Sequence, residues 1–307
     1  MSIAIAKDET AKAPGTAKIA AVGMFDGVHA GHRYLLDELR REGERRGLEP
    51  LAVTFSNHPL EVVCPKRAPL LLTSAAEKEA LIRAEGIGEV VCLPFDEALR
   101  GTSAEDFLRL LRKGYGVEAL LMGFNNRFGH DAPRDFGAYR ALGAEQGVEI
   151  LPATEYRPAG AAAAPSSTAI RGALAEGRVE DAAAMLGRPY AVTGRVVHGR
   201  ELGRRLGFPT ANVEVAPWRQ LPQPGVYAAR CGGLPAMVNI GHRPTVDAPR
   251  APLSVEAHII GLPEGTDLYG RELTLEFARR LRGERRFGSL EELAAQLRRD
   301  REEATKG

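Results

Sequence analysis

Hydrophobic and polar positions divide the chain into two stretches with different periods. From residue 18 to about 151, short apolar runs such as KIAAVGMF and PLAVTF alternate with amphipathic segments. The runs GEVVCLPF, EALLMGF and GVEILPA are three further expected strands, and the helical patterns fall at 33–46, 74–85, 103–113 and 135–146. This alternation is typical of a parallel sheet covered by helices on both faces.

The second half of the chain has a different pattern. Two short helical segments, STAIRGALAEG and VEDAAAMLG, follow a stretch rich in Pro, Ala and Gly. Beyond Arg188 and Pro189, strand-like segments separated by Gly and Pro turns follow in the order YAVTGRVVHG, GVYAARCGG, LPAMVNIG, LSVEAHIIG and RELTLEFARRLR. That pattern predicts an antiparallel sheet closing into a small barrel. The last segment, SLEELAAQLRRDREEA, predicts a helix with Ser289 as N-cap and Glu292 as its capping-box partner.

These patterns predict an α/β domain at 1–186 and a β-barrel domain with a C-terminal helix at 187–307. Lys and Arg number 41 against 40 Asp and Glu, so no net field favours nucleic acid or an anionic membrane. No apolar run approaches the ~20 residues that span a bilayer, and the charged N-terminal stretch does not resemble a signal peptide. The three cysteines are scattered and form no CxxC pair. We therefore expect a cytoplasmic globular protein that binds neither nucleic acid nor membrane.

The segment GMFDGVHAGH stands between the first expected strand and the first expected helix. A helix N-terminus presents unpaired N–H groups that bind phosphate, and the glycines at 23, 27 and 31 allow a nucleotide to approach the backbone. His29 and His32, three residues apart, can face one space and donate to a phosphoryl oxygen. A purely structural histidine pair is the alternative, which the agreement of strand, glycines, histidines and helix disfavours.

FDGVHAGH is similar to the HxGH signature of the nucleotidyltransferase superfamily, in the form typical of bacterial bifunctional riboflavin kinase/FAD synthetases. SSTAIR, residues 166–171, resembles the second phosphate-binding signature of that superfamily, and TFSNHP and GFNNRFG stand where this family has similar stretches. In the second half, the segments VVHGRELGRRLGFPTAN, PGVYAARCGG, NIGHRPT, VEAHIIG and DLYGRELTLEF resemble its riboflavin kinase module in order and spacing. The resemblance covers roughly residues 18 to 304.

For the first domain the resemblance implies a Rossmann-like nucleotidyltransferase that transfers AMP from ATP to FMN, giving FAD and pyrophosphate. The residues that match as catalytic are His29, His32 and Arg171. The residues expected to bind ATP and its phosphates are Gly23, Phe25, Asp26, Gly31, Ser167 and Thr168. The candidate flavin contacts are Asn125, Arg127 and Phe128. The alternatives are a plain helix N-cap at Ser166 and Ser167 and a polar turn after a strand at the flavin candidates.

The second domain contains no G-x-x-x-x-G-K-[ST] pattern, so a kinase there must hold ATP differently. In GRRLGFPTAN, Gly203 and Gly207 allow close approach to phosphates. Thr210 and Asn212, two apart, carry oxygen ligands suited to Mg²⁺, unless they form only a turn with side-chain-to-backbone bonds.

The chemistry of a kinase also needs a group that orients the riboflavin 5′-hydroxyl and accepts its proton. The resemblance assigns this to a strand glutamate, which Glu256 in VEAHII matches. By alternation Glu256 shares a face with His258, and a solvent-facing strand pair is the alternative.

Three positions depart from the family pattern. Pro165 replaces an apolar β-former, while Ala169 and Leu202 stand where many relatives carry arginine. We expect altered loop geometry or affinity rather than lost activity. The leading interpretation is an enzyme that uses riboflavin, FMN, ATP and Mg²⁺ to make FMN and then FAD. A protein with one activity only, or a non-catalytic flavin- or nucleotide-binding regulator, is the alternative, and a weak homo-oligomer is left open.

Overall fold

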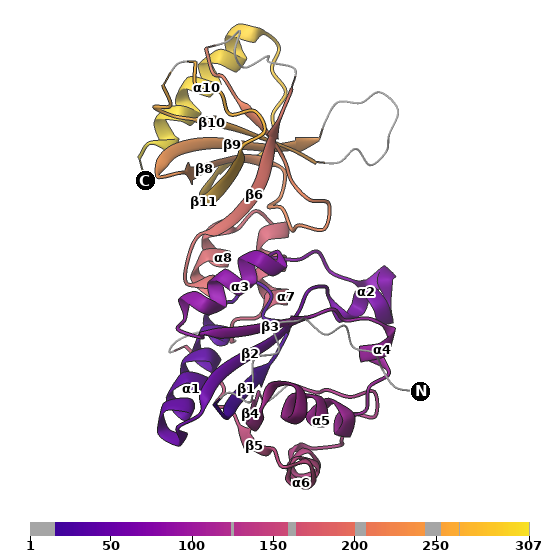
Figure 1. Ribbon diagram of the computed structural model, residues 1–307. Helices are drawn as coiled ribbons and strands as arrows, with labels where there is room; N and C mark the ends of the chain where they lie inside the picture. Colours follow the sequence, from indigo (N-terminus) through magenta and orange to yellow (C-terminus); the bar gives the residue numbers. More distant parts are fainter. Residues whose placement is uncertain are drawn as a thin grey trace. The chain divides into compact units, whose positions relative to one another are not determined.

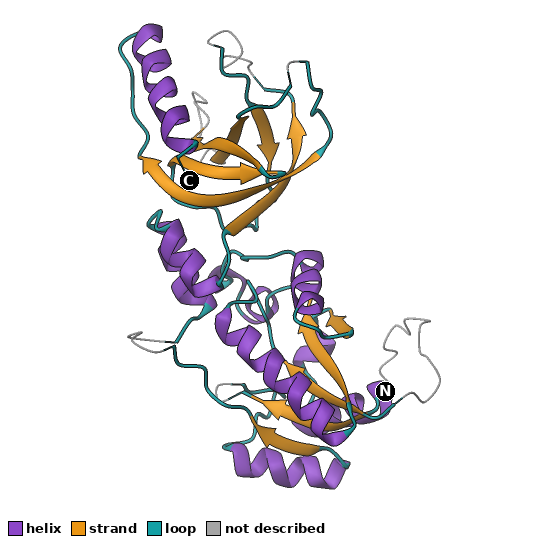
Figure 2. Cartoon of the chain, turned by 90° about the vertical axis from the view of Figure 1, so that its left-hand side faces the viewer, coloured by secondary structure: helices purple, strands orange, loops and turns teal. Residues whose placement is uncertain are grey.

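The computed structural model describes residues 16–123, 126–158, 164–199, 207–242, 253–263 and 265–306. The chain forms two compact units, Met1–Ala164 and Pro165–Gly307. The first contains a parallel sheet with helices, and the second contains a closed antiparallel barrel with a C-terminal helix (Figure 1, Figure 2). The predicted fold class is therefore confirmed.

The sheet of the first unit has the order β3-β2-β1-β4-β5, and all its pairings are parallel. Its strands are β1 (Lys18–Val22), β2 (Glu49–Phe55), β3 (Glu89–Leu93), β4 (Val117–Met122) and β5 (Glu149–Pro152). The long helices are α1 (Ala30–Arg46), α3 (Ala75–Ala84), α5 (Ala104–Tyr115) and α6 (Phe136–Gln146). Three short helical segments lie outside the sequence predictions: α2 (Pro59–Val63), η1 (Pro65–Arg67) and α4 (Glu97–Arg100).

The central strand β1 is buried on both faces. Ile19 and Ala21 belong to the apolar cluster under α1 and α3, whereas Ala20 and Val22 belong to the cluster under α5 and α6. A strand covered on both sides reads as one continuous apolar run, which is why KIAAV shows no alternation. The strand order reverses between β1 and β4. In open α/β sheets, ligands bind beyond the carboxyl ends of the strands at such a point.

The second unit closes its barrel in the order β10-β7-β6-β11-β8-β9. The strands are β6 (Tyr190–Val197), β7 (Ala211–Glu214), β8 (Gly225–Cys231), β9 (Leu234–His242), β10 (Leu253–Ile259) and β11 (Glu272–Arg282). The helices are α7 (Ser167–Ala175), α8 (Val179–Leu186) and α10 (Leu290–Ala304). The four-residue strand β7 was not among the expected strands, because its sequence ANVE has no apolar run of its own.

The division between the units falls before α7 and α8. Helix α8 packs against β6 and β11, and the Gln223 N–H donates to the Leu174 carbonyl at 2.8 Å. These two helices are therefore part of the barrel's compact unit. The predicted domain boundary between residues 186 and 187 differs from this division of compact units, and the assignment of one activity to each side of it stays a prediction.

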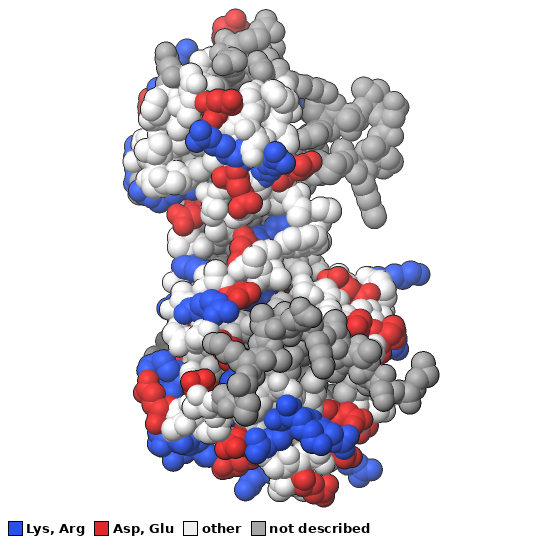
Figure 3. Space-filling model, in the orientation of Figure 1, with Lys and Arg blue, Asp and Glu red and all other residues white. Residues whose placement is uncertain are grey.

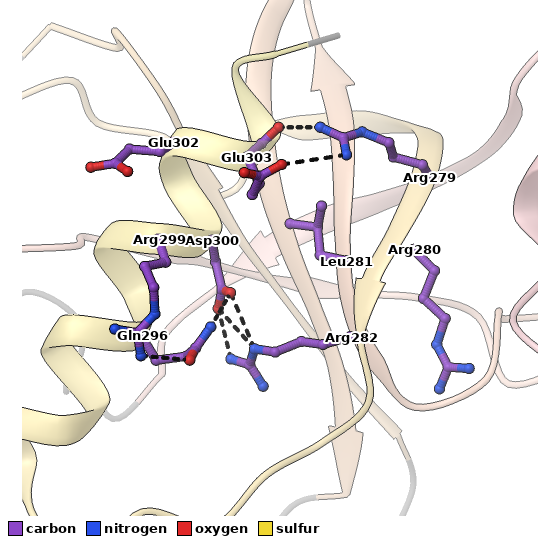
Figure 4. Close-up of a pocket in the computed structure, with 9 residues that line it drawn as sticks. All are labelled: Arg279, Arg280, Leu281, Arg282, Gln296, Arg299, Asp300, Glu302 and Glu303. Carbon is purple, nitrogen blue, oxygen red and sulfur yellow. Dashed lines mark hydrogen bonds and ion pairs between the residues drawn. The ribbon is translucent and has the colours of Figure 1, made fainter.

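Helix α10 is attached to β11 by a partly buried ion pair (Figure 4). The guanidinium of Arg282 lies 2.8 Å from the carboxylate of Asp300, which is 3% exposed, and the Gln296 amide donates to the same carboxylate at 2.7 Å. The surrounding cavity, of about 560 Å³, is lined largely by charged groups of β11 and α10. Removing either partner would leave the other charge without a counter-charge, which is costly. This contact therefore stabilises the packing of the helix on the barrel.

The N-terminus of α10 differs in one detail from expectation. Ser289 is the N-cap, and its hydroxyl accepts from the Glu292 N–H at 3.2 Å. The predicted reciprocal bond of a capping box is wrong, because the Glu292 carboxylate accepts from the Gly288 N–H at 3.0 Å instead. The Glu292 carboxylate therefore binds the backbone N–H of the residue before the N-cap, and not that of the N-cap itself.

The surface of each unit carries mixed charges on the face shown in Figure 3, with acidic and basic side chains side by side. Much of this mixture consists of pairs three or four residues apart on helices, such as Arg40 with Asp37 and Glu44 on α1. Among the described residues, no helix is long and apolar enough to cross a bilayer.

Packing of α6 against β5 requires glycine at position 143. A Cβ there would lie 2.5 Å from the Val148 carbonyl oxygen and 2.6 Å from Cγ1 of Ile150. We expect Gly143→Ala to lower the free energy of unfolding by about 1–3 kcal/mol because the helix must shift. Gly114→Ala in α5 is the matched control, since its nearest contact would be 3.4 Å, and it should be neutral or stabilising by up to about 1 kcal/mol. Urea unfolding of both variants measures this, and equal midpoints would contradict it.

Candidate functional site

The turn between β1 and α1 has an unusual backbone. Phe25 and Val28 have φ angles of 48° and 38°, and Gly27 between them has a φ of 80°. Positive φ is unfavourable for residues with a side chain, above all for a β-branched valine, and costs about 1–3 kcal/mol a residue. Such strain persists only where surrounding contacts hold it, and it is enriched at functional turns.

Buried hydrogen bonds hold this turn against the segment that precedes α3. The carboxylate of Asp26, 2% exposed, accepts from the N–H groups of Leu72 and Thr73 at 2.9 and 3.1 Å. The Thr73 hydroxyl donates to it at 3.2 Å and accepts from the Gly27 N–H at 3.0 Å. These contacts support a positioning role for Asp26, and its expected contact with ATP stays a prediction.

The two histidines lie together at the N-terminus of α1. His29 is the N-cap, and its Nδ1 accepts from the His32 N–H at 3.3 Å. The two rings are stacked, with centroids 3.6 Å apart, and the ring of Phe25 meets His32 edge-on at 5.2 Å. Gly31 lies between the histidines in the first turn of the helix. The spacing of three has thus brought both imidazoles to one place, in the segment that follows the carboxyl end of β1.

Burial gives His32 distinctive electrostatics. It lowers the pKa of the imidazole well below its usual range, and the charges of His29 and Lys78 act in the same direction. Nδ1 of His32 is buried and has no hydrogen-bond partner among the described residues. Because buried polar atoms are nearly always satisfied, an unpartnered ring nitrogen here indicates a site that a ligand completes.

The loop after β4 is joined to the end of β1. The side-chain amide of Asn126 donates to the Val22 carbonyl, and the Asn126 N–H donates to the Gly123 carbonyl at 2.9 Å. The flavin candidate expected from the sequence is the neighbouring Asn125, which lies outside the described residues. Two consecutive asparagines gave no basis for choosing between them, so Asn126 was missed.

The other two flavin candidates differ in their surroundings. Arg127 is exposed and donates to the Arg134 carbonyl at 2.7 Å. The ring of Phe128 packs 4.7 Å from that of Tyr139, whose hydroxyl donates to the Phe128 carbonyl at 2.8 Å. The contacts of Phe128 therefore support anchoring of this loop, and flavin binding by either residue stays a prediction.

The second expected phosphate motif opens helix α7. Ser166 is its N-cap, with the hydroxyl accepting from the Ala169 N–H at 3.2 Å, so the N-cap interpretation holds for Ser166. Ser167, Thr168 and Arg171 follow in the first turns of this helix. Pro165 immediately precedes the N-cap and leaves its geometry intact.

In the barrel, strand pairing surrounds Glu256 with amides. Glu256 on β10 lies opposite Asn212 of β7 on one side and opposite Asn239 of β9 on the other. Directly opposite residues have Cβ atoms about 4.5–5.5 Å apart, so the three side chains are neighbours. Asn239 begins the segment NIGHRPT, but it was not selected as a site residue because its place beside Glu256 depends on the register of β9 against β10.

His258, two residues further along β10, is 7% exposed. Its Nδ1 lies 2.8 Å from the Pro209 carbonyl oxygen and its ring meets Phe208 edge-on. The alternative of a solvent-facing strand pair is therefore wrong at His258, because the segment that leads into β7 covers it.

Asn212 is also fixed from the other side of its strand. A Cβ at Gly199 would lie 1.9 Å from Nδ2 of Asn212, so only glycine leaves room for this amide. Gly207, φ 79°, has open space around its Cα, and Thr210 is half-buried just before β7. Gly203 and Leu202 lie outside the described residues. No group of three or more His, Cys, Asp or Glu side chains suited to a metal ion occurs in the described parts of the chain.

A parallel sheet with a histidine-bearing helix N-terminus at its switch point, followed by a closed barrel, defines a nucleotidyltransferase-like unit and a barrel unit. The family model for FAD synthetase matches residues 12–167, and that for riboflavin kinase matches residues 186–307. The chain is 40% identical over 296 residues to the bifunctional riboflavin kinase/FMN adenylyltransferase of Escherichia coli K12, covering 94% of this chain and 92% of that protein. The Pseudomonas fluorescens protein of the same description is 38% identical over 287 residues, covering 92% and 90%. The chain belongs to the family of bifunctional riboflavin kinase/FMN adenylyltransferases.

The fold likeness extends over both units. A crystal structure described as a macrolide-efflux protein from Streptococcus pneumoniae matches with a TM-score of 0.82 and 27% identity, covering 97% of each chain. Riboflavin, FMN and ATP are the substrates of the family to which the chain belongs.

The electrostatics of His32 can be tested directly. Because its folded-state pKa lies below that of an ordinary histidine, the unfolded chain binds more protons at this residue as the pH falls below about 6.5. Its contribution to stability is present above that pH and decreases on acidification. We expect the His32 ring resonances in NMR to titrate well below pH 6.5 in the native protein and near about 6.5 in urea. Equal midpoints in the two states would refute the burial argument.

Proposed function

We propose that the turn at the N-terminus of α1 carries out the adenylyl transfer of this family and that Glu256 carries out its kinase step. The observation that supports the first assignment best is the stacked pair of the buried His29 and the half-buried His32, whose ring nitrogen Nδ1 is buried and has no partner among the described residues, at the switch point of the sheet. A structural histidine pair would be expected to have its ring nitrogens satisfied.

In the adenylyl transfer, a phosphate oxygen of FMN attacks the α-phosphorus of ATP and pyrophosphate leaves. No bond to the enzyme forms, so the rate depends on positioning and on stabilising charge at the phosphoryl oxygens. The N–H groups at the start of α1 and the two imidazoles are the donors proposed for that charge, with Gly23 and Gly31 leaving room for the nucleotide. For Ser167, Thr168 and Arg171, we propose binding of phosphate at the N-terminus of α7.

In the kinase step, Glu256 orients the riboflavin 5′-hydroxyl and takes its proton as the oxygen attacks the γ-phosphorus of ATP, and ADP leaves with the bridging oxygen. The amides of Asn212 and Asn239 flank this carboxylate and fit a site where it must be held in one orientation. The hydroxyl of Thr210 and the amide oxygen of Asn212 are hard donors beside the proposed phosphate site, so they fit Mg²⁺. Bound there, the ion would neutralise charge on the phosphates.

We further propose that the protein acts in the cytoplasm, on small molecules rather than on nucleic acid or membranes. The support is the near-balance of charge, 41 basic against 40 acidic side chains. A weak homo-oligomer stays a prediction.

One assay tests the whole assignment. Purified protein is given riboflavin, ATP and Mg²⁺, and the flavins are separated by chromatography over time. FMN followed by FAD is the expected result. FMN alone, or FAD only from supplied FMN, would favour the single-activity alternative, and no product would favour the non-catalytic binder.

The role of His32 predicts a selective defect. His32→Ala should lower the rate of FAD formation on the order of a hundredfold, because a lost transition-state donor costs about 3 kcal/mol. Riboflavin phosphorylation, measured on the same preparation, should hardly change, since it belongs to the other unit. An unaltered FAD rate would refute the assignment of His32.

Glu256→Gln tests the kinase mechanism. The amide keeps the size of the side chain and can still bind the hydroxyl, but it cannot take the proton, so kcat should fall about 10²–10⁴-fold with little change in the KM for riboflavin. FAD formation from supplied FMN should continue. Glu276→Gln, at an exposed position of β11, is the control. Normal kinase turnover in Glu256→Gln would mean that Glu256 has no chemical role.

A further inference from the structure

A lysine side chain is buried beneath the strained turn. Lys78, in the first turn of α3, is 2% exposed. Its ammonium donates to the Met24 carbonyl at 3.0 Å and to the Phe55 carbonyl at 2.6 Å. Met24 lies in the turn just before Phe25, and Phe55 is the last residue of β2. Lys78 thus joins the carboxyl ends of two neighbouring strands at the entrance to the histidine turn.

Both acceptors of Lys78 are uncharged, and within the described residues its ammonium meets no carboxylate at ion-pair distance. The Met24 carbonyl already has a neutral donor, since the hydroxyl of Thr54 reaches it at 3.1 Å. Burying a charge without a paired counter-charge is costly, and a tether between two strands does not require one. The positive charge itself therefore needs an explanation.

The charge of Lys78 acts on the groups around it. Burial lowers the pKa of the ammonium, while Cys92 of β3 and Asp26 of the turn act in the opposite direction. Lysine starts from a pKa of about 10.4, and two carbonyl acceptors favour the protonated form. His32 of α1 in turn experiences Lys78 as a neighbouring positive charge, which lowers its pKa.

We propose that Lys78 is a positioning residue for the adenylyl transfer, whose buried positive charge attracts and orients the phosphates of ATP at the β1–α1 turn. This proposal rests on the proposed function of His29 and His32. A triphosphate carries several negative charges and would add to the counter-charge that Asp26 supplies from beyond ion-pair distance. Helix α3 lies with α1 on one face of the sheet (Figure 1), and Lys78 reaches from α3 to the Met24 carbonyl in the turn.

The test compares variants that separate charge from tethering. Lys78→Met removes the ammonium at similar length, and Lys78→Gln removes the charge but keeps N–H donors. Thr54→Val removes only the neutral donor to the same Met24 carbonyl. Lys18→Met is the matched control, because Lys18 lies at the other end of β1 and pairs with Glu89 at 2.7 Å.

Two measurements apply to every variant. The first is the rate of FAD formation from FMN over a range of ATP concentrations. The second is the NMR titration of His32, which needs no catalysis.

Both charge-removing variants should lower kcat/KM for ATP about tenfold or more, the effect of one charge at short range in a protein. They should also raise the titration midpoint of His32, while Lys18→Met leaves both unchanged and Thr54→Val has a smaller effect. If Lys78→Met does not fold, Lys78→Gln is read alone.

The proposal is overturned if removing the charge alters neither quantity, or if Thr54→Val reproduces the whole effect, since tethering would then suffice. A failure of the proposed function gives a different result. In that case His32→Ala leaves FAD formation intact, while the His32 titration in the Lys78 variants still reports the loss of the Lys78 charge.

Discussion

The conformation of the β1–α1 turn is the constraint on which the first unit depends. Two residues with side chains hold positive φ angles there, at a cost of about 1–3 kcal/mol each. The buried carboxylate of Asp26 and its donors at Leu72 and Thr73 offset that cost. This turn places His29 and His32 together at the N-terminus of α1, with their rings stacked and the His32 N–H bonded to His29 Nδ1.

In the barrel, strand register positions the candidate catalytic side chain. A glutamate on an exposed strand would rotate freely, but pairing on both sides of β10 gives Glu256 two amide neighbours from different strands. The close approach of Gly199 then limits where the Asn212 amide can lie. The position of Glu256 in this site is decided by hydrogen bonding between strands that are far apart in the chain, since β10 pairs with β7 as well as with β9.

Much of the architecture could be predicted because local patterns and tertiary environment agree. Strands buried on both faces read as apolar runs, helices covered on one face read as amphipathic, and SLEEL begins with its own cap. Strand β7 was missed because ANVE is short and acquires strand character only by pairing with β6 and β10. Lys78 was missed for a similar reason, since a lysine near the start of a charged helix normally faces solvent.

The sequence by itself determined the α/β and barrel classes, the positions of most elements, and the two motifs whose residue types suit phosphate chemistry. Those features depend on periodicity and on neighbouring residues, which are local. Only the tertiary structure decided that Asp26 faces the Leu72–Thr73 backbone, that Asn126 bonds to the end of β1, and that Asn239 flanks Glu256. These contacts join residues far apart in the chain, and their hydrogen-bond geometry and desolvation depend on how the chain packs, which no local pattern encodes.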